Sequence, residues 1–137
     1  MIRLIERASD GRISEADYAT IVGFWDGRGS PPARNLLPTL GVISDGAACG
    51  FLYLDATGSG VAVMAWTATN PRCSVTFRGR AMHEVIDFLE REAGALGYHT
   101  VMCTHQHLSF HRLFHRRGYA SGDSGLVQLY KSVSPAR

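Results

Sequence analysis

The pattern of hydrophobic and polar positions changes near residue 70. Before that point, short apolar runs alternate with turn residues. Three of these runs, Thr39–Ser44, Ala48–Asp55 and Val61–Thr69, are separated by Asp45-Gly46 and by the glycine-rich stretch 57–60. Asp-Gly between apolar runs is typical of a tight hairpin turn. The three runs therefore predict consecutive antiparallel strands.

The N-terminal segment predicts one strand and one helix. Residues Ile2–Ala8 begin with alternating apolar and charged positions, which favours a first strand. Ser14 is a suitable N-cap, and the next apolar residues share one helical face: Tyr18, Ile21, Val22 and Trp25. Gly27 and Gly29 are expected to end this helix. Residues 30–38 are consistent with either a loop or a short helix.

Beyond residue 70 the apolar period becomes helical. Five apolar residues recur at this spacing, namely Met82, Ile86, Leu89, Ala93 and Leu96. We predict that a turn at Arg78–Ala81 opens this long helix. The alternative is an earlier start within Arg72–Thr76. Thr100–Thr104 has the length of a buried strand, and a strand–helix–strand connection is right-handed and joins parallel strands.

The C-terminal segment predicts a further helix and strand. A helix over Leu108–Arg117 is expected to stop at Gly118-Tyr119, and a last strand is expected over Leu126–Val133. Together the elements predict one α/β domain over residues 1–137. Its sheet would have six or seven strands, mostly antiparallel with a central parallel pair, and helices on both faces.

Composition narrows the functional classes only slightly. The chain has 137 residues, 45% of them hydrophobic and 19% charged, with a formal net charge of +2. This charge is too small to indicate a nucleic-acid partner. Three cysteines without a C-x-x-C pair fit a reducing compartment, so we expect a cytoplasmic protein. No signal peptide or membrane-spanning run is apparent.

A group of histidines raises the question of a metal site. Two histidines four residues apart on a helix can bind zinc or nickel, and this segment contains His105, His107, His111 and His115. Apart from Cys103, no carboxylate or thiolate is close in sequence to complete such a site. We therefore interpret these residues as a solvated, weakly basic helix face and expect no native metal.

The order of elements after residue 60 resembles the GNAT superfamily of acyl-CoA N-acyltransferases. In that family the turn between a central strand and a long helix holds the pyrophosphate of coenzyme A, and the central parallel strands are splayed. The family pattern there is Gln/Arg-x-x-Gly-x-Gly/Ala, and on this chain it falls on Arg78, Ala81 and His83. The first position matches, whereas Ala81 and His83 depart from the family pattern.

The resemblance implies a set of cofactor-binding residues. Coenzyme A would lie between the strands Val61–Thr69 and Thr100–Thr104, with its pyrophosphate on backbone N–H groups of residues 78–83. A bulky residue in place of Gly79 would then weaken binding. The residues implied to contact the cofactor are Ala68, Thr69, Arg78, Gly79, Arg80, Ala81, His83, His107 and Phe114.

The resemblance also implies a catalytic arrangement, from which this chain departs. The family's second helix often carries Asn-x-x-Ala-x-x-Leu-Tyr, and aligned on Gly118-Tyr119 its Asn falls on His107 and its Tyr on Phe114. That Tyr commonly protonates the leaving thiolate, which a phenyl ring cannot do. His107 could donate a proton instead. Candidate bases are Asp55, Glu6 and His83.

Three functions are compatible with these residues. We favour an enzyme, an N-acetyltransferase that uses acetyl-CoA to acylate an amine of a small molecule or protein. The alternative is a non-catalytic GNAT-like binding or assembly module. A nucleic-acid-associated protein using the basic residues 112–117 has the least support. The residues are also compatible with a homodimer.

Overall fold

The computed structural model describes residues 1–55, 58–105, 108–122, 129 and 131. The chain divides into two units, residues 1–105 and 106–137, and each is described by itself. Within the described residues, no helix is both long enough and apolar enough to cross a membrane. The expectation of a single domain over the whole chain stays a prediction.

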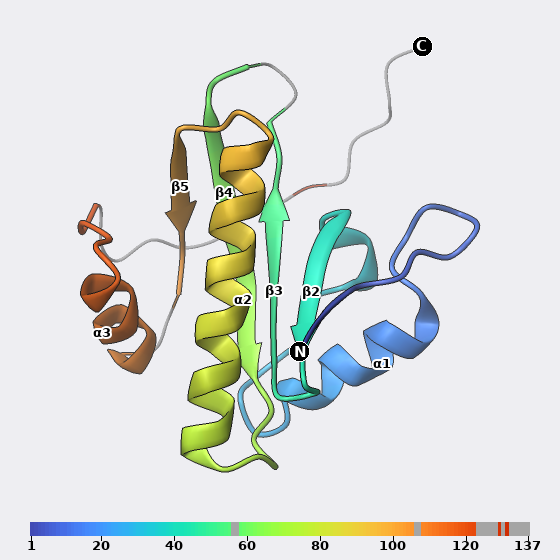
Figure 1. The fold of residues 1–137 in the computed structure, drawn as a ribbon. Helices are drawn as coiled ribbons and strands as arrows, with labels where there is room; N and C mark the ends of the chain where they lie inside the picture. The colour runs from blue at the N-terminus through green and yellow to red at the C-terminus, as the bar shows by residue number, and fades with distance from the viewer. Residues whose placement is uncertain (56–57, 106–107, 123–128, 130, 132–137) are drawn as a thin grey trace. The chain divides into compact units, whose positions relative to one another are not determined.

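The first unit is built on a five-stranded sheet with the order β1-β2-β3-β4-β5 (Figure 1). Neighbours from β1 to β4 pair antiparallel, and β4 pairs parallel with β5. The expected antiparallel run and the parallel pair are therefore confirmed. The predicted last strand, Leu126–Val133, lies outside the described residues except at 129 and 131. The five strands are β1 (Ile2–Leu4), β2 (Leu40–Ser44), β3 (Ala48–Tyr53), β4 (Val61–Thr69) and β5 (Thr100–Cys103).

Helix α1 (Glu15–Phe24) begins where the sequence predicts. The Ser14 hydroxyl accepts a hydrogen bond from the Asp17 N–H at 3.2 Å, which satisfies one of the unpaired N–H groups of the first turn. The connection that follows contains a short 3-10 helix, η1 (Arg34–Leu36), so the short-helix alternative for residues 30–38 is the observed one.

Helix α2 (Val75–Ala95) begins earlier than the turn predicted at residues 78–81. Ser74 is its N-cap, and the Ser74 hydroxyl accepts from the Phe77 N–H at 3.2 Å. Nothing between Val75 and Arg78 interrupts a helix, and one glycine inside a long amphipathic helix is tolerated. The prediction that Arg78–Ala81 forms an opening turn is therefore wrong, and the alternative start near Arg72–Thr76 is correct.

The two long helices of this unit cover opposite faces of the sheet. Gly50 faces α2 so closely that an added Cβ would lie 2.7 Å from the Val85 methyl carbon. The next residue, Phe51, belongs to the buried cluster that includes Ile21 and Phe24 of α1. Because successive strand residues point to opposite faces, α1 and α2 must lie on different sides. The expected helices on both faces are confirmed.

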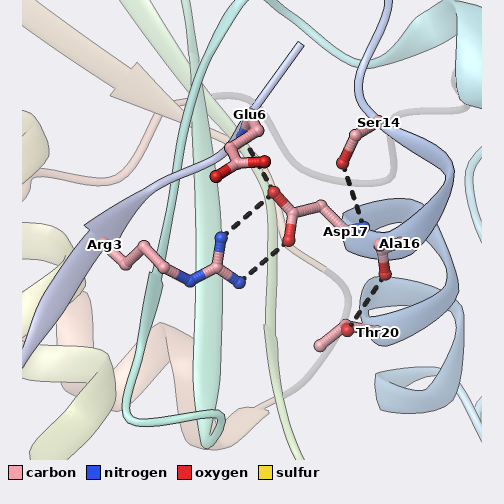
Figure 2. A network of polar contacts seen from close by, with 6 residues as sticks. All are labelled: Arg3, Glu6, Ser14, Ala16, Asp17 and Thr20. Carbon is pink, nitrogen blue, oxygen red and sulfur yellow. Dashed lines mark hydrogen bonds and ion pairs between the residues drawn. The ribbon is translucent and has the colours of Figure 1, made fainter. Parts of the chain in front are cut away.

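A buried carboxylate joins α1 to the first strand (Figure 2). Asp17, only 6% exposed, accepts two hydrogen bonds from the Arg3 guanidinium at 2.9 and 3.1 Å and a third from the Glu6 N–H at 2.8 Å. Burial alone would raise the pKa of the Asp17 carboxyl. The hydrogen bonds from Arg3 and Glu6 outweigh that effect, so the pKa lies below its usual value.

The second unit contains helix α3 (Leu108–Arg116). The Gly118 φ of 94° ends the helix, as predicted from the sequence. The Tyr119 N–H donates to the Phe114 carbonyl at 3.0 Å, and the two rings meet edge to face with centroids 4.9 Å apart.

Candidate functional site

The parallel β4–β5 pair lies at one edge of the described sheet and is paired over four residues only. Val61 to Met64 of β4 lie opposite Thr100 to Cys103 of β5, and the ladder ends there. β4 continues for five more residues, to Thr69. On the β5 side of this segment, no strand in the described part of the chain completes the hydrogen bonding. Within the described residues, β4 therefore has an open edge beside the end of β5.

A β-bulge lies directly after the last paired residue of β4. On the other side of β4, Phe51 pairs with Ala65 and Cys49 pairs with Ala68, so β4 contains one residue more than β3. Trp66 has a φ of 54°, which bulky residues rarely adopt. Bulges re-aim a strand and are frequent next to functional sites. Here the bulge changes the direction of β4 where its edge becomes open.

Two polar contacts hold the bulge in place. The Trp66 indole N–H donates to the Tyr53 hydroxyl at 2.9 Å, and that hydroxyl in turn donates a hydrogen bond to the Leu36 carbonyl. The Cys49 thiol lies 3.6 Å from the Trp66 carbonyl oxygen. Burial raises the pKa of Cys49 to about 12, with the Ala68 N–H opposing the shift, so this thiol stays protonated at neutral pH.

The N-terminus of α2 follows shortly after the end of β4. The Asn70 side chain accepts from the Arg72 N–H at 2.9 Å and donates to the Gly46 carbonyl at 2.9 Å, which fixes the connection. The first N–H groups of a helix have no partner within it. Because Ser74 caps the Phe77 N–H, the free groups are those of Val75 and Thr76, and such groups favour an anion.

Three arginines lie around this connection. Arg28, in the loop after α1, donates to the Thr69 carbonyl at 2.7 Å and to its hydroxyl at 3.2 Å. Arg72 forms an ion pair with Asp26. Burial, and then the nearby charge of Arg78, lower the pKa of Arg28. The end of β4 and the start of α2 are thus positively charged.

The residues predicted for the pyrophosphate turn lie inside α2. The Arg78 N–H donates to the Ser74 carbonyl at 3.0 Å, and the N–H groups of residues 79–83 are likewise directed along the helix. Ala81 is buried. The backbone role expected for Arg78, Gly79, Arg80, Ala81 and His83 is therefore wrong, because these groups are already used. The side chains of Arg78 and Arg80 remain available.

Ala68 and Thr69, the other predicted contacts on the strand, lie at the end of β4 beyond the bulge. Ala68 is buried, and Thr69 is half-buried with both its oxygens facing Arg28. Both residues belong to the segment of β4 whose edge is open. Their role in binding stays a prediction.

The structure does not bring together the two predicted catalytic residues that it describes, Asp55 and His83. Asp55 follows β3 at the closed end of the β4–β5 pair, beside a shallow cavity of about 240 Å³ lined also by Gly60 and Tyr98. β4 spans about 26 Å, so Asp55 lies far from Thr69. His83 is exposed and nine residues into α2, not at a helix N-terminus as expected. His107 lies outside the described residues.

The other candidate groups are a cysteine that could act as a nucleophile and side chains that could bind a metal ion. Burial, and then the charge of Glu90, raise the pKa of Cys103 to about 11, so this thiol at the end of β5 is a poor nucleophile. Among the described residues no group of three histidine, cysteine or acidic side chains could hold a metal ion. His111 and His115 lie close, with ring centroids 4.4 Å apart.

Several features of this region were not predicted from the sequence. The Trp66 bulge has no sequence signal, because the positive φ occurs without a glycine. The Arg28–Thr69 contact joins residues 41 apart in sequence, which spacing cannot reveal. The α2 start could have been found, since Ser74 precedes an apolar helical run and is a typical N-cap.

Comparisons with known proteins identify the fold. No family model matches the chain, and no curated protein gives a significant match. Solved structures match over nearly the whole chain. A transcriptional regulator from Bacillus halodurans C-125 is 13% identical with a TM-score of 0.65, covering 95% of this chain and 99% of that one.

Two acetyltransferases also match over nearly the whole chain. Glucosamine-6-phosphate N-acetyltransferase from Arabidopsis thaliana is 8% identical with a TM-score of 0.59, covering 96% of this chain and 99% of that one. An aminoglycoside acetyltransferase from an uncultured soil metagenomic sample, in complex with sisomicin, is 11% identical with a TM-score of 0.55, covering 97% of both chains. The chain therefore has the GNAT-like acetyltransferase fold, as the sequence predicted. Identities this low show the fold alone.

Proposed function

We propose that the chain is an acyl-CoA-dependent N-acyltransferase, with acetyl-CoA as donor and an amine of a small molecule or protein as acceptor. The observation that carries this proposal is the short β4–β5 pairing, which ends at Met64 and Cys103 while β4 continues to Thr69. An open strand edge beside a parallel partner suits an extended ligand that carries amide groups. The pantetheine arm of coenzyme A is such a ligand.

The ends of this edge suit the two ends of the cofactor. The pyrophosphate would lie at the start of α2, where the Val75 and Thr76 N–H groups and nearby arginines favour an anion. The thioester would then lie near the bulge at Trp66, several residues back along β4. This direction follows from the chain alone, because the positive charge lies at the Thr69 end of the strand.

The proposed reaction requires few catalytic side chains. The acceptor nitrogen attacks the thioester carbonyl, a C–N bond forms and the C–S bond breaks. The nitrogen loses one proton, and the leaving thiolate takes one up. Positioning of a neutral amine against the thioester supplies much of the rate. Asp55 is too far away to act as base, and His107 stays the predicted proton donor.

Two measurements on the full chain test this proposal. Acetyl-CoA should raise the midpoint of thermal unfolding, since a ligand that binds only the native state stabilises it. A panel of amines should then release coenzyme A thiol above the background of the donor alone. No thermal shift with millimolar acetyl-CoA, together with no thiol release, would overturn the proposal.

A non-catalytic GNAT-like binding module is the second candidate. It is favoured by Phe114, which stands where the family commonly has the tyrosine acid, and by the similarity to a structure described as a transcriptional regulator. This function predicts a thermal shift with coenzyme A but no thiol release with any amine.

The three cysteines bear on the compartment in which the protein works. All three are free thiols, which supports a reducing compartment, and we propose the cytoplasm.

A further inference from the structure

The hydroxyl of Tyr53, at the bulge, has hydrogen bonds whose directions are fixed. It accepts from the Trp66 indole N–H at 2.9 Å and donates its own proton to the Leu36 carbonyl. An indole N–H can only donate and a carbonyl oxygen can only accept, so neither bond can reverse. A hydroxyl has one proton and two acceptor lone pairs. The two bonds therefore leave one lone pair, and no proton, for a further partner.

The Tyr53 side chain lies on the accessible face of this part of the sheet. Leu52 and Met64, which pair across β3 and β4, are 1% and 0% exposed. Leu52 shares the face of Gly50, which α2 covers (Figure 1). Tyr53 points to the other face and is 37% exposed. A small molecule can therefore reach the bulge beside Tyr53, whereas α2 closes the opposite face.

The free lone pair selects the kind of ligand that can bind there. A group that carries an N–H can donate to the Tyr53 hydroxyl, but a carbonyl, carboxylate or phosphate oxygen would find no proton on it. Strand β4 itself contains no carboxylate. An ammonium or amine at the bulge would thus depend on the hydroxyl for its contact with these two strands.

We propose that the Tyr53 hydroxyl binds the acceptor nitrogen by accepting a hydrogen bond from one of its N–H groups. The inference rests on the proposed function for the position of the thioester near Trp66. The hydrogen bond orients the nitrogen, so that its lone pair can attack the thioester carbonyl. Tyr53 does not act as a base, because its own proton is held by the Leu36 carbonyl, which cannot take it up. The proton that the nitrogen loses goes to water.

Tyr53→Phe and Tyr18→Phe form a matched pair of variants. Each keeps its ring and loses one hydroxyl, and the Tyr18 hydroxyl also donates to the connection after α1, at the Pro32 carbonyl (2.8 Å). The probes are methylamine, n-butylamine and benzylamine, each beside its trimethylammonium analogue. At neutral pH both members of each pair are cations, but the analogue has no N–H.

NMR titration of the full chain, with and without coenzyme A, measures the binding of each probe. We expect the parent to bind at least one primary amine about ten-fold more tightly than its analogue, as for a hydrogen bond to a charged group. That amine should also shift the indole N–H resonance of Trp66, which Trp25→Phe distinguishes from the other of the two indoles. Tyr53→Phe should lose the preference, and Tyr18→Phe should keep it.

Thiol release with the same amines gives a second readout. Tyr53→Phe should raise the KM for the amine about ten-fold, while the Kd for acetyl-CoA stays at the parent value. A distorted bulge would weaken both. If the parent releases thiol, and Tyr53→Phe keeps the preference or Tyr18→Phe loses it equally, the role of Tyr53 is rejected and the proposed function stands.

A parent that neither binds coenzyme A nor releases thiol rejects the proposed function, and the probes then decide on Tyr53 alone. A preference for the amine that only Tyr53→Phe loses supports the contact, and any other result rejects it. If Tyr53→Phe unfolds, the parent decides. A Trp66 indole N–H that shifts with an amine but not with its analogue supports the inference, and the absence of such a shift rejects it.

Discussion

Trp66 donates its indole N–H to the hydroxyl of Tyr53 at 2.9 Å, and this bond joins β4 to β3 at the bulge. The backbone of Trp66 is left-handed, with a φ of 54°. A conformation that is costly for a bulky residue persists only when its surroundings determine it. The side-chain contacts of Trp66 therefore maintain the bulge that turns β4 at the open edge.

This relationship predicts an unusual order of stabilities at position 66. In a strand, glycine is ordinarily less stable than alanine, but a positive φ reverses the preference. We expect Trp66→Gly to be more stable than Trp66→Ala by about 1 kcal/mol, although both lose the packing of the indole. Urea denaturation measures the difference. At Trp25, whose φ is −89°, glycine should show no such advantage over alanine.

The Arg3–Asp17 pair predicts how stability depends on pH. Because the folded pKa of Asp17 is lowered, the pair stabilises the protein above the usual pKa of an aspartate, and this contribution is lost as the pH falls through the folded pKa. We expect Asp17→Asn to cost about 2 kcal/mol at pH 7, as for loss of charged hydrogen bonds. The difference from the parent should shrink in acid.

Denaturation from pH 7 to pH 2 measures this contribution. Asp10→Asn is the control, because Asp10 pairs with Arg12 at the exposed surface. Its effect at pH 7 should be much smaller than that of Asp17→Asn. An Asp17→Asn protein whose deficit is constant across this range would contradict the linkage.

Gly79 predicts a stabilising substitution, contrary to its expected role in a phosphate turn. It lies inside α2, and a Cβ added there would meet nothing within 4 Å. Alanine should therefore stabilise the helix by about 0.5–1 kcal/mol. Gly94, in the same helix with the same open surroundings, should behave alike. Gly97 has a φ of 91° after the helix, so Gly97→Ala should destabilise. Thermal unfolding of the three variants checks these signs.

The sequence predicted the elements whose signals are local and repeated. The β4 strand was predicted with its observed bounds, and Ser14 was correctly identified as the N-cap of α1. The parallel β4–β5 pair followed from the handedness of a strand–helix–strand connection. These features depend on neighbours in sequence or on general chain geometry, so a single sequence carries them.

The site was predicted less well because its features depend on contacts between distant residues. The family pattern on Arg78 predicts a later start for α2 than the observed Val75, whereas the N-cap signal at Ser74 is local and indicates the observed start. Asp55 was a reasonable carboxylate in sequence, but the antiparallel return from β3 to β4 places it at the closed end of the strand pair. The Trp66 bulge and the Arg28–Thr69 contact arise only on folding.

Phe114 carries the prediction that separates a weak enzyme from a binding module. The resemblance places it where a tyrosine would protonate the leaving thiolate, so Phe114→Tyr should raise thiol release from acetyl-CoA about ten-fold if that acid is missing. Phe114 is only 2% exposed, and a buried hydroxyl needs a partner, so the variant should also lose about 1 kcal/mol of stability. Phe110→Tyr, one turn earlier on α3, is the control and should leave thiol release unchanged.

A Phe114→Tyr protein that binds coenzyme A but releases thiol no faster than the parent would reject the missing-acid account. Release at background in both proteins, with binding intact, would establish the module instead.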